Sequence, residues 1–347
     1  MEKERPRPGK AAFLYPSAGC SHSTGVVSCR TVNTTKDIAA EILELKKKRN
    51  AVILAHSYQR PEVQDIADFV GDSLGLARKS NNLDADVIVF CGVHFMAETA
   101  AILAPTKRVL LPDIDAGCSL AATISASEMR QWKSEHPDAV VVSYVNTSAE
   151  VKALTDYCCT SSNAVSVVNA IPADKEVLFC PDMFLGQHVK QQTGRTNMHI
   201  WAGECHVHAG LKPAVIQKKL DEHSEAEFLM HPECGCTSDL LYLRGTGEAC
   251  TTGAKVLSTE GMVNYAKKSS SSGFVIATET GILHRLKQMN PGKNFWAVND
   301  LAVCRFMKMI TIEKVLRSLK EDMYHITVPP AVAERASQAI QRMVEIG

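Results

Sequence analysis

The sequence predicts an α/β protein with three pseudo-symmetric, three-layer αβα domains whose parallel sheets surround one central site. Two observations support this prediction. Short apolar, β-rich segments alternate with helical patterns from residue 36 onward, and polar residues recur at nearly fixed intervals where those segments end. Alternation of this kind is typical of βαβ units, in which helices cover a parallel sheet.

Ten apolar segments are predicted to form strands. They are AVILA (51–55), VIVF (87–90), VLLP (109–112), VVVSYV (140–145), VLFC (177–180), MHIWA (198–202), FLMH (228–231), KVLS (255–258), FVIAT (274–278) and HITV (325–328). Among the helical stretches, 37–48 carries Ile38, Ile42 and Leu45 on one face, with Thr34 or Thr35 as its N-cap. The predicted domains are 35–122 together with the C-terminal segment 306–347, then 123–208, and then 209–305.

Length and composition limit the possible functions. The chain has 347 residues, 45% of them hydrophobic, and its 38 basic residues balance 38 acidic ones. Because there is no basic excess, we expect no nucleic-acid partner. No apolar run approaches the roughly 20 residues that a membrane-spanning helix needs. We expect residues 1–34, which lack periodicity, to form a flexible extension rather than an organellar transit peptide.

Polar residues at three strand ends are separated by a nearly constant interval. The pairs are His56 with Tyr58, Tyr144 with Asn146, and His231 with Glu233. The interval from position 56 to 144 differs by a single position from the interval between 144 and 231. A hydroxyl follows each pair. Ser73 lies as far beyond the first pair as Ser161 lies beyond the second, and Thr259 lies further beyond the third, as if a short segment were inserted there. Three similar modules explain this pattern.

Three of the twelve cysteines follow the same spacing. Cys118 follows His56 at almost the same interval at which Cys205 follows Tyr144. Cys304 follows His231 at a longer interval, and the extra length equals the extra length between His231 and Thr259. Ligands of parallel α/β sheets bind beyond the carboxyl ends of the strands. The spacing therefore predicts three thiols that meet in one cavity.

Three converging thiolates can bind a 4Fe-4S cluster and leave one iron without a protein ligand, open to act as a Lewis acid. Zinc is the rival metal, although structural zinc sites favour close pairs such as C-x2-C. Three unrelated buried thiols are the alternative without a metal. Disulfides are not expected, because no secretory signal is recognisable.

The other cysteines are expected to have no catalytic role. Four are interpreted as small hydrophobes in or near apolar segments, namely Cys91, Cys158, Cys159 and Cys180. Surface loops are expected to hold Cys234, Cys236 and Cys250, with a second metal or a redox pair as the alternative. His208, in the sequence CHVH, either supports a cluster sulfur or orients a helix start.

Several motifs resemble the quinolinate synthase family. They are ILAHSYQRPEVQDIADFVGDSLGLAR, VSYVNTSAEVKA, TSSNAV, CPDMFLGQ, WAGECHVH, HPECGC, STEGM, TETGILHRLKQMNP and AVCRFMKM. The resemblance runs from about residue 38 to the C-terminus, and the motifs occur in the same order. This chain departs from the family in a longer stretch between Glu233 and Thr259.

The resemblance implies a cytoplasmic enzyme of NAD biosynthesis that holds one 4Fe-4S cluster on Cys118, Cys205 and Cys304. It implies condensation of iminoaspartate with dihydroxyacetone phosphate to quinolinate, with loss of phosphate and two waters. The substrate-contacting positions that it implies are His56, Tyr58, Ser73, Tyr144, Asn146, Ser161, His231, Glu233 and Thr259. The iminoaspartate-producing oxidase and cluster-assembly proteins are the partners expected by family analogy.

The expected catalytic roles follow from side-chain chemistry. Glu233 is expected to be the principal base, with a pKa raised by burial in a water-poor cavity. Tyr58 is the expected acid or hydrogen-bond donor to an oxyanion, His56 and His231 position and relay protons, and Tyr144 orients the substrate. Two alternative functions remain at this stage: another cluster-dependent hydro-lyase, and a non-catalytic iron–sulfur sensor, which usually has four cysteine ligands.

Overall fold

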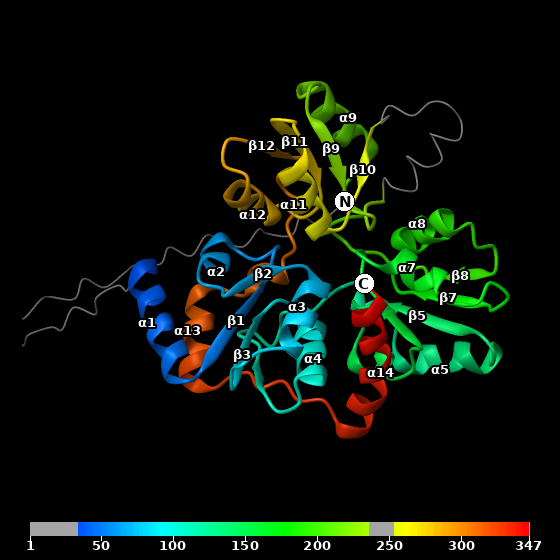
Figure 1. The fold of residues 1–347 in the computed structure, drawn as a ribbon, viewed down its shortest axis with the longest axis horizontal. Helices are drawn as coiled ribbons and strands as arrows, with labels where there is room; N and C mark the ends of the chain where they lie inside the picture. Colours follow the sequence, from blue (N-terminus) through cyan, green and yellow to red (C-terminus); the bar gives the residue numbers. More distant parts are fainter. Residues whose placement is uncertain (1–33, 236–252, 347) are drawn as a thin grey trace, which may run out of the picture. The chain divides into compact units, whose positions relative to one another are not determined.

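The computed structural model describes residues 34–235 and 253–346; residues 1–33, 236–252 and 347 lie outside the described ranges. The predicted extension and the insertion that includes Cys236 and Cys250 therefore fall almost wholly outside them. In the described part, parallel strands form separate four-stranded sheets (Figure 1). The first sheet contains β1 (Ala51–His56), β2 (Phe69–Gly71), β3 (Val87–Cys91) and β4 (Arg108–Leu110).

The second and third sheets repeat the first. The second contains β5 (Val140–Tyr144), β6 (Tyr157–Cys159), β7 (Val177–Cys180) and β8 (Met198–Ile200). The third contains β9 (Glu227–Met230), β10 (Lys255–Val256), β11 (Gly273–Ala277) and β12 (Asn294–Ala297). Their strand orders are β2-β1-β3-β4, β6-β5-β7-β8 and β10-β9-β11-β12, so in every sheet the second strand is added outside the first and the fourth lies at the other edge.

Helices alternate with the strands. Around the first sheet they are α1 (Thr35–Lys48), α2 (Pro61–Asp65), α3 (Ser73–Asn81) and α4 (His94–Leu103). Around the second they are α5 (Ala126–Glu135), α6 (Ala149–Lys152), α7 (Ala164–Asn169) and α8 (Met183–Thr193), and around the third α9 (Pro213–Glu222), α11 (Thr259–Lys268) and α12 (Ile282–Met289). The 3-10 turns η1 (Ala121–Thr123) and η2 (Met307–Met309) and the helices α13 (Ile312–Glu321) and α14 (Pro330–Ile346) complete the described elements.

The predicted fold class is confirmed: three parallel sheets with one shared strand order lie between helical layers. In Figure 1, α1 and α13 lie on one side of the first sheet, and α3 and α4 lie on the other. The sheets lie within residues 51–110, 140–200 and 227–297. The domain boundaries at 122, 208 and 305 stay a prediction.

Burial explains why the strand segments are continuously apolar. Parallel strands covered on both faces lose the alternation of polar and apolar residues, and β3, β7 and β11 are buried along their whole length. One cluster of buried side chains continues through all three sheets, from Ile53 through Val142 to Phe274. Of the two predicted N-cap candidates, Thr34 caps α1, and it forms a capping box with Asp37.

The prediction of a strand over HITV (325–328) is wrong. His325 makes only an isolated antiparallel bridge to Leu110 at the edge of the first sheet, and Pro329 and Pro330 follow directly. The pairing ends at Ile326, whose N–H donates to the carbonyl of Val109, and the prolines, which donate no backbone hydrogen bond, prevent a longer strand. Conversely, the short strands β2, β6 and β12 were not predicted.

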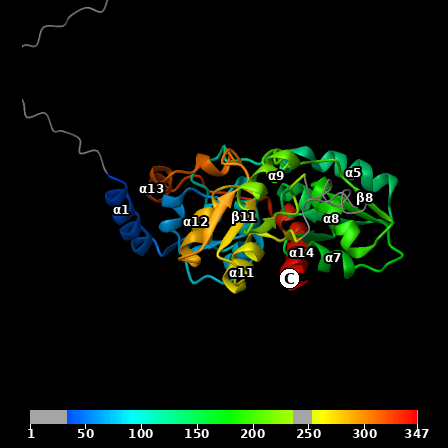
Figure 2. The ribbon, with the colours of Figure 1, turned by 90° about the horizontal axis from the view of Figure 1, so that it is seen from above.

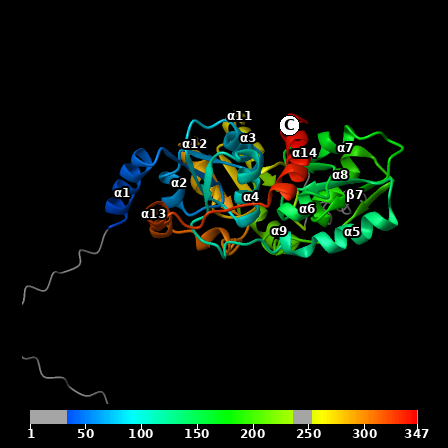
Figure 3. The ribbon, with the colours of Figure 1, turned by 90° about the horizontal axis from the view of Figure 1, so that it is seen from below.

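The two C-terminal helices join parts of the chain that are far apart in sequence. Figures 1 and 2 show α13 beside α1. Figures 1 and 3 show α14 between the helices of the first and second sheets, where it contacts α4, α6 and β6. The Asn163 side chain donates to the carbonyl of Met343 at 2.8 Å. None of the helices in residues 34–235 and 253–346 has the length and apolar character needed to cross a membrane.

The position of α14 generates a stability prediction. Ile340 is fully buried on its packed face, whereas Gln338 is exposed on the same helix. Ile340→Ala is expected to lower the free energy of unfolding by about 2–5 kcal/mol, because it leaves a cavity between the helices of the first two sheets. Gln338→Ala is the matched control and should change it by less than about 0.5 kcal/mol. Urea denaturation measures both, and equal stabilities of the two variants would contradict this packing role.

Candidate active site

All twelve residues that the sequence singled out line one pocket. The space inside it is about 700 Å³, including its opening to solvent. These residues are His56, Tyr58, Ser73, Cys118, Tyr144, Asn146, Ser161, Cys205, His231, Glu233, Thr259 and Cys304. The pocket thus brings together residues from all three modules, which are spread along the sequence from His56 to Cys304.

The polar residues come from the same topological places in each sheet. His56 and Tyr144 are the last residues of β1 and β5, and His231 follows β9. Ser73 and Thr259 are the first residues of α3 and α11, the helices that follow β2 and β10, the second strands of their sheets. Because the first strand is an inner strand of each sheet, its polar terminus is buried: His56, Tyr144 and His231 are 5%, 5% and 2% exposed.

The cysteines occupy loops that follow the fourth strand of each sheet. Residues beside them link the loops: Ser119 Oγ lies 2.7 Å from His206 Nδ1. The His206 ring meets the Phe306 ring edge-to-face at 5.9 Å between centroids. The loops that carry Cys118, Cys205 and Cys304 are therefore in mutual contact.

The three pocket thiols suit a soft metal group. None of the eight cysteines in the described ranges forms a disulfide, and the pocket thiols are half-buried whereas the other five are buried. Burial raises the pKa of the Cys118 thiol to about 12, so a nearby cation is required for it to become a thiolate. Thiolate donors favour iron–sulfur clusters and zinc. The donor set of Cys118, Cys205 and Cys304 therefore fits the cluster predicted from the spacing.

Cys234 lies elsewhere than expected. Instead of a surface loop it occupies a fully buried position, packed with Val207, Met230 and neighbouring apolar residues of the third sheet. In these apolar surroundings the side chain packs as a small hydrophobe. Cys91, Cys158, Cys159 and Cys180 are likewise buried, as predicted.

Glu233 is the charged centre of the pocket. Its Oε2 forms an ion pair with Nδ1 of His208 at 3.0 Å. The Tyr144 hydroxyl donates to the other oxygen, Oε1. A sulfur of Cys205, a nitrogen of His208 and an oxygen of Glu233 all lie within 4.8 Å of one another, so this trio also has metal-binding geometry.

The expected rise in the pKa of Glu233 is wrong. Burial does favour the neutral acid, but the positive charge of His208 and the hydrogen bond from Tyr144 outweigh it and hold the pKa of Glu233 well below its usual value. The same pairing keeps His208 protonated: burial opposes its charge, yet Cys205 and Glu233 raise its pKa. Glu233 is therefore an anion in this pocket.

The other two histidines are neutral. Burial lowers the pKa of His56 and of His231 to about 3. His231 Nε2 lies 3.2 Å from Ser161 Oγ, and its ring stacks on His208 with 4.8 Å between centroids. His56 Nδ1 accepts the backbone N–H of Tyr58 at 3.1 Å, which fixes that ring.

The Tyr58 hydroxyl bridges two sheets. It lies 2.6 Å from Thr278 Oγ1 and accepts from Thr259 Oγ1 at 3.2 Å. Burial and the charge of Glu233 raise the pKa of Tyr58 above its ordinary value. The phenol therefore keeps its proton. Nearby, Asn146 Oδ1 is a buried acceptor with no hydrogen-bond partner within the described residues.

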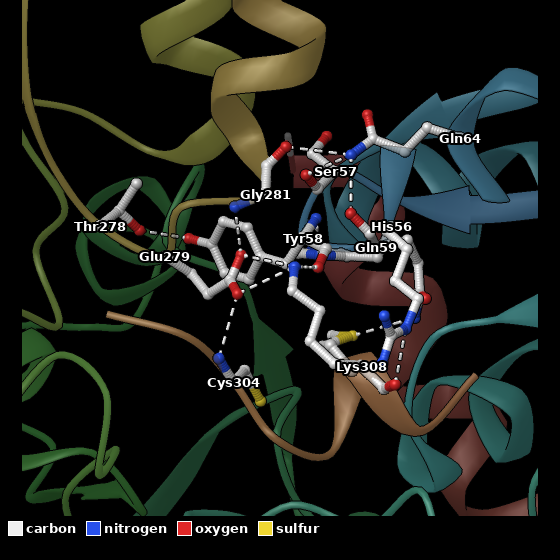
Figure 4. A network of polar contacts seen from close by, with 12 residues as sticks. His56, Ser57, Tyr58, Gln59, Gln64, Thr278, Glu279, Gly281, Cys304 and Lys308 are labelled. Carbon is white, nitrogen blue, oxygen red and sulfur yellow. Dashed lines mark hydrogen bonds and ion pairs between the residues drawn. The ribbon is translucent and has the colours of Figure 1, made fainter. Parts of the chain in front are cut away.

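A buried network ties the Tyr58 segment to the Cys304 loop (Figure 4). Glu279 Oε1 accepts the backbone N–H of Cys304 at 3.0 Å, and Oε2 accepts that of Gly281 at 2.6 Å. Lys308 Nζ lies 3.0 Å from Glu279 Oε1 and donates to the carbonyl of Tyr58. A Cβ on Gly281 would approach the Lys308 ammonium and the Tyr58 backbone to within 2.6 and 2.8 Å, so this contact requires glycine.

Sequence reasoning missed the residues at the ends of the third strands. Strand register pairs Cys91, Cys180 and Ala277 with equivalent residues of their first strands. Just beyond them lie Val93, Asp182 and Glu279. Because the type of residue differs among the three copies, the repeat gave no signal for Glu279. The signal that could have found Glu279 was the run of polar residues directly after the apolar segment FVIAT.

Comparison with known proteins identifies the family of this chain. The family model described as quinolinate synthetase A protein matches residues 40–345. The chain belongs to this family. Membership bears out the resemblance seen in the motifs.

Named relatives cover nearly the whole chain. It is 58% identical over 310 residues to a quinolinate synthase of Thermus thermophilus, covering 89% of this chain and 97% of that protein. It is 55% identical over 316 residues to a quinolinate synthase of Mycobacterium sp. strain KMS, covering 91% and 94%. A solved Plasmodium falciparum diphosphate reductase (E-1-hydroxy-2-methyl-but-2-enyl-4-diphosphate reductase) covers 83% of this chain and 94% of its own, with 12% identity and a TM-score of 0.29, too low for any argument.

The Glu279–Lys308 pair generates a prediction on stability. Glu279→Gln and Lys308→Met should each lower the free energy of unfolding by about 3–5 kcal/mol, since each leaves an uncompensated buried group. The double variant should cost less than the sum of the two, with a coupling of about 0.5–3 kcal/mol. Urea denaturation of the four proteins measures this cycle. Strictly additive effects would mean that the two side chains do not interact.

Proposed function

We propose that this chain is a quinolinate synthase of NAD biosynthesis, which condenses iminoaspartate with dihydroxyacetone phosphate to quinolinate, inorganic phosphate and two waters. One observation carries the proposal: thiols, hydroxyls and acid–base groups from three repeated modules line a single pocket. The family of named relatives supports the same reaction. The oxygen sensitivity of such a cluster favours a reducing compartment, so we propose a cytoplasmic location with cluster-assembly proteins and the iminoaspartate-producing oxidase as partners.

The polar side chains suit two anionic substrates. Iminoaspartate carries two carboxylates and the triose carries a phosphate, which are hydrogen-bond acceptors. We propose that Ser73, Ser161 and Thr259 donate to them, together with the backbone amides at the starts of α3 and α11. The buried Oδ1 of Asn146 accepts no hydrogen bond from the described residues. We propose that a substrate nitrogen or hydroxyl donates to it.

Cys118, Cys205 and Cys304 are the proposed cluster ligands. When bound, the cluster supplies one iron without a protein ligand, a Lewis acid for a substrate oxygen. The overall reaction transfers no net electrons. Glu279 supports this arrangement indirectly, because its carboxylate accepts the backbone N–H of Cys304 and so orients that loop.

Proton transfers are assigned to the buried groups. Glu233 is the proposed base: it is ionised, but its lowered pKa makes it a weak base, so its effect depends on position next to the substrate rather than on high basicity. Tyr58, which keeps its proton, donates a hydrogen bond to a developing oxyanion. His56 and His231 position substrate and relay protons, and Tyr144 orients both Glu233 and the substrate.

The proposed reaction can be tested directly. Protein prepared and reconstituted without oxygen, when supplied with iminoaspartate and dihydroxyacetone phosphate, is expected to release quinolinate and one phosphate per turnover. Mass spectrometry and a phosphate assay measure the two products. Failure to form quinolinate with a full complement of iron and acid-labile sulfide would overturn the proposal and favour another hydro-lyase or a sensor.

Removing one proposed ligand should abolish the cluster. Cys118→Ser is expected to lose visible absorbance, iron and sulfide, because two thiolates and an alcohol bind the cluster poorly. Cys91→Ala is the matched control: its thiol is buried outside the pocket lining, so its cluster content should be that of the original protein. Normal iron and sulfide in Cys118→Ser would remove this residue from the ligand set.

Removing the proposed base should separate binding from chemistry. Glu233→Gln is expected to keep the cluster spectrum and to lower kcat by about 10²–10⁴-fold, because the amide cannot accept a proton. Glu345→Gln, on an exposed position of α14, is the control and should retain full activity. Unchanged turnover in Glu233→Gln would assign the base to another group.

A further inference from the structure

We propose a second metal site, for a divalent ion of the zinc class, formed by His136, Glu176 and His199 on the second sheet. His136 Nδ1 lies 3.1 Å from Glu176 Oε1, and His199 Nε2 lies 2.5 Å from the same oxygen. The three ligand atoms all lie within 4.8 Å of one another. Two imidazoles and one carboxylate are a donor set that binds zinc and related ions, with water completing the coordination.

The backbone holds all three residues in place. Glu176 immediately precedes β7, and its carbonyl accepts the N–H of Val140 at 2.8 Å. His199 lies within β8, where it pairs with Leu178 of β7. His136 directly follows α5 as its C-cap, and its N–H donates to the carbonyl of Trp132 at 3.1 Å. Ligands on helix ends and strands are positioned better than ligands on free loops.

Trp132 orients the two imidazoles. Its ring stacks on His136 with 4.1 Å between centroids and 8° between planes. Its edge meets His199 at 5.8 Å and 64°. Stacking on one face of His136 fixes the ring so that Nδ1 points to Glu176, which lowers the entropy that metal binding must overcome.

A hydrogen-bonded ion pair also satisfies these contacts, but it requires a proton on each imidazole nitrogen that faces the same carboxylate oxygen. A divalent cation would replace both protons and satisfy all three donors at once. The side chains of His136, Glu176 and His199 are 29%, 37% and 47% exposed, so an ion can reach them from solvent.

This site is separate from the pocket. Glu176 and His136 precede the amino ends of β7 and β5, whereas Tyr144 is the last residue of β5 and Cys205 lies beyond the carboxyl end of β8. A metal ion there would link α5 to the second sheet and stabilise that part of the fold without contacting substrate. Metal binding at this site is therefore independent of the proposed reaction.

The test compares metal binding by the cluster-loaded protein and by matched variants without oxygen. Calorimetric titration with Zn²⁺ is expected to show one more equivalent in the original protein than in His136→Gln/His199→Gln. Ni²⁺ should quench Trp132 fluorescence in the original protein and not in that variant. Quinolinate formation should be unchanged, because these residues lie outside the pocket lining.

A second histidine–tryptophan stack provides the control. His223 stacks on Trp296 at 4.0 Å and 15°, so His223→Gln removes a similar ring pair, and it should leave Zn²⁺ stoichiometry and Ni²⁺ quenching intact. Trp132→Phe should remove the quenching yet retain the extra equivalent. Equal Zn²⁺ stoichiometry in the original protein and in His136→Gln/His199→Gln would overturn the site.

Discussion

The pocket depends on one geometric constraint: every strand of a parallel sheet ends at the same edge. Each sheet adds its second strand outside the first and its fourth at the opposite edge, so equivalent loops carry equivalent groups. The inner first strand places a histidine or tyrosine where it is buried, and the edge fourth strand is followed by a longer loop that places a cysteine nearer solvent. Because all three sheets repeat this arrangement, the pocket is formed by residues from three separate segments of the chain.

Spacing made much of this arrangement predictable. A repeat of nearly constant length selected Cys118, Cys205 and Cys304 from twelve cysteines, because equivalent loops in a repeated fold lie at equivalent positions. Three strands escaped prediction for a physical reason: β2, β6 and β12 lack the run of aliphatic residues that marks segments such as AVILA and VIVF. HITV failed in the opposite direction, since its apolar character was real but it pairs with the edge of the first sheet through a single bridge.

Electrostatics required three-dimensional contacts. Burial alone implies a neutral Glu233, and that expectation overlooked a second buried group from another loop. His208 precedes the whole of α9 and β9 in sequence, yet its ring nitrogen lies 3.0 Å from the Glu233 carboxylate, so its charge decides the outcome. Glu279 and Lys308 are a second example. They form an ion pair from different segments of the chain, and the repeat does not predict either residue. Pairwise charge interactions between loops cannot be inferred from positions within one module.

The packing of α14 has a consequence for biosynthesis. Every cysteine and acid–base residue of the pocket precedes Ile312, whereas α14, which packs between the helices of the first two sheets, begins at Pro330. A ribosome therefore completes every pocket residue before it makes the helix that packs between the first two sheets. A nascent chain that stopped before Pro330 would contain the whole pocket sequence and still lack the contacts of α14 with α4, α6 and β6.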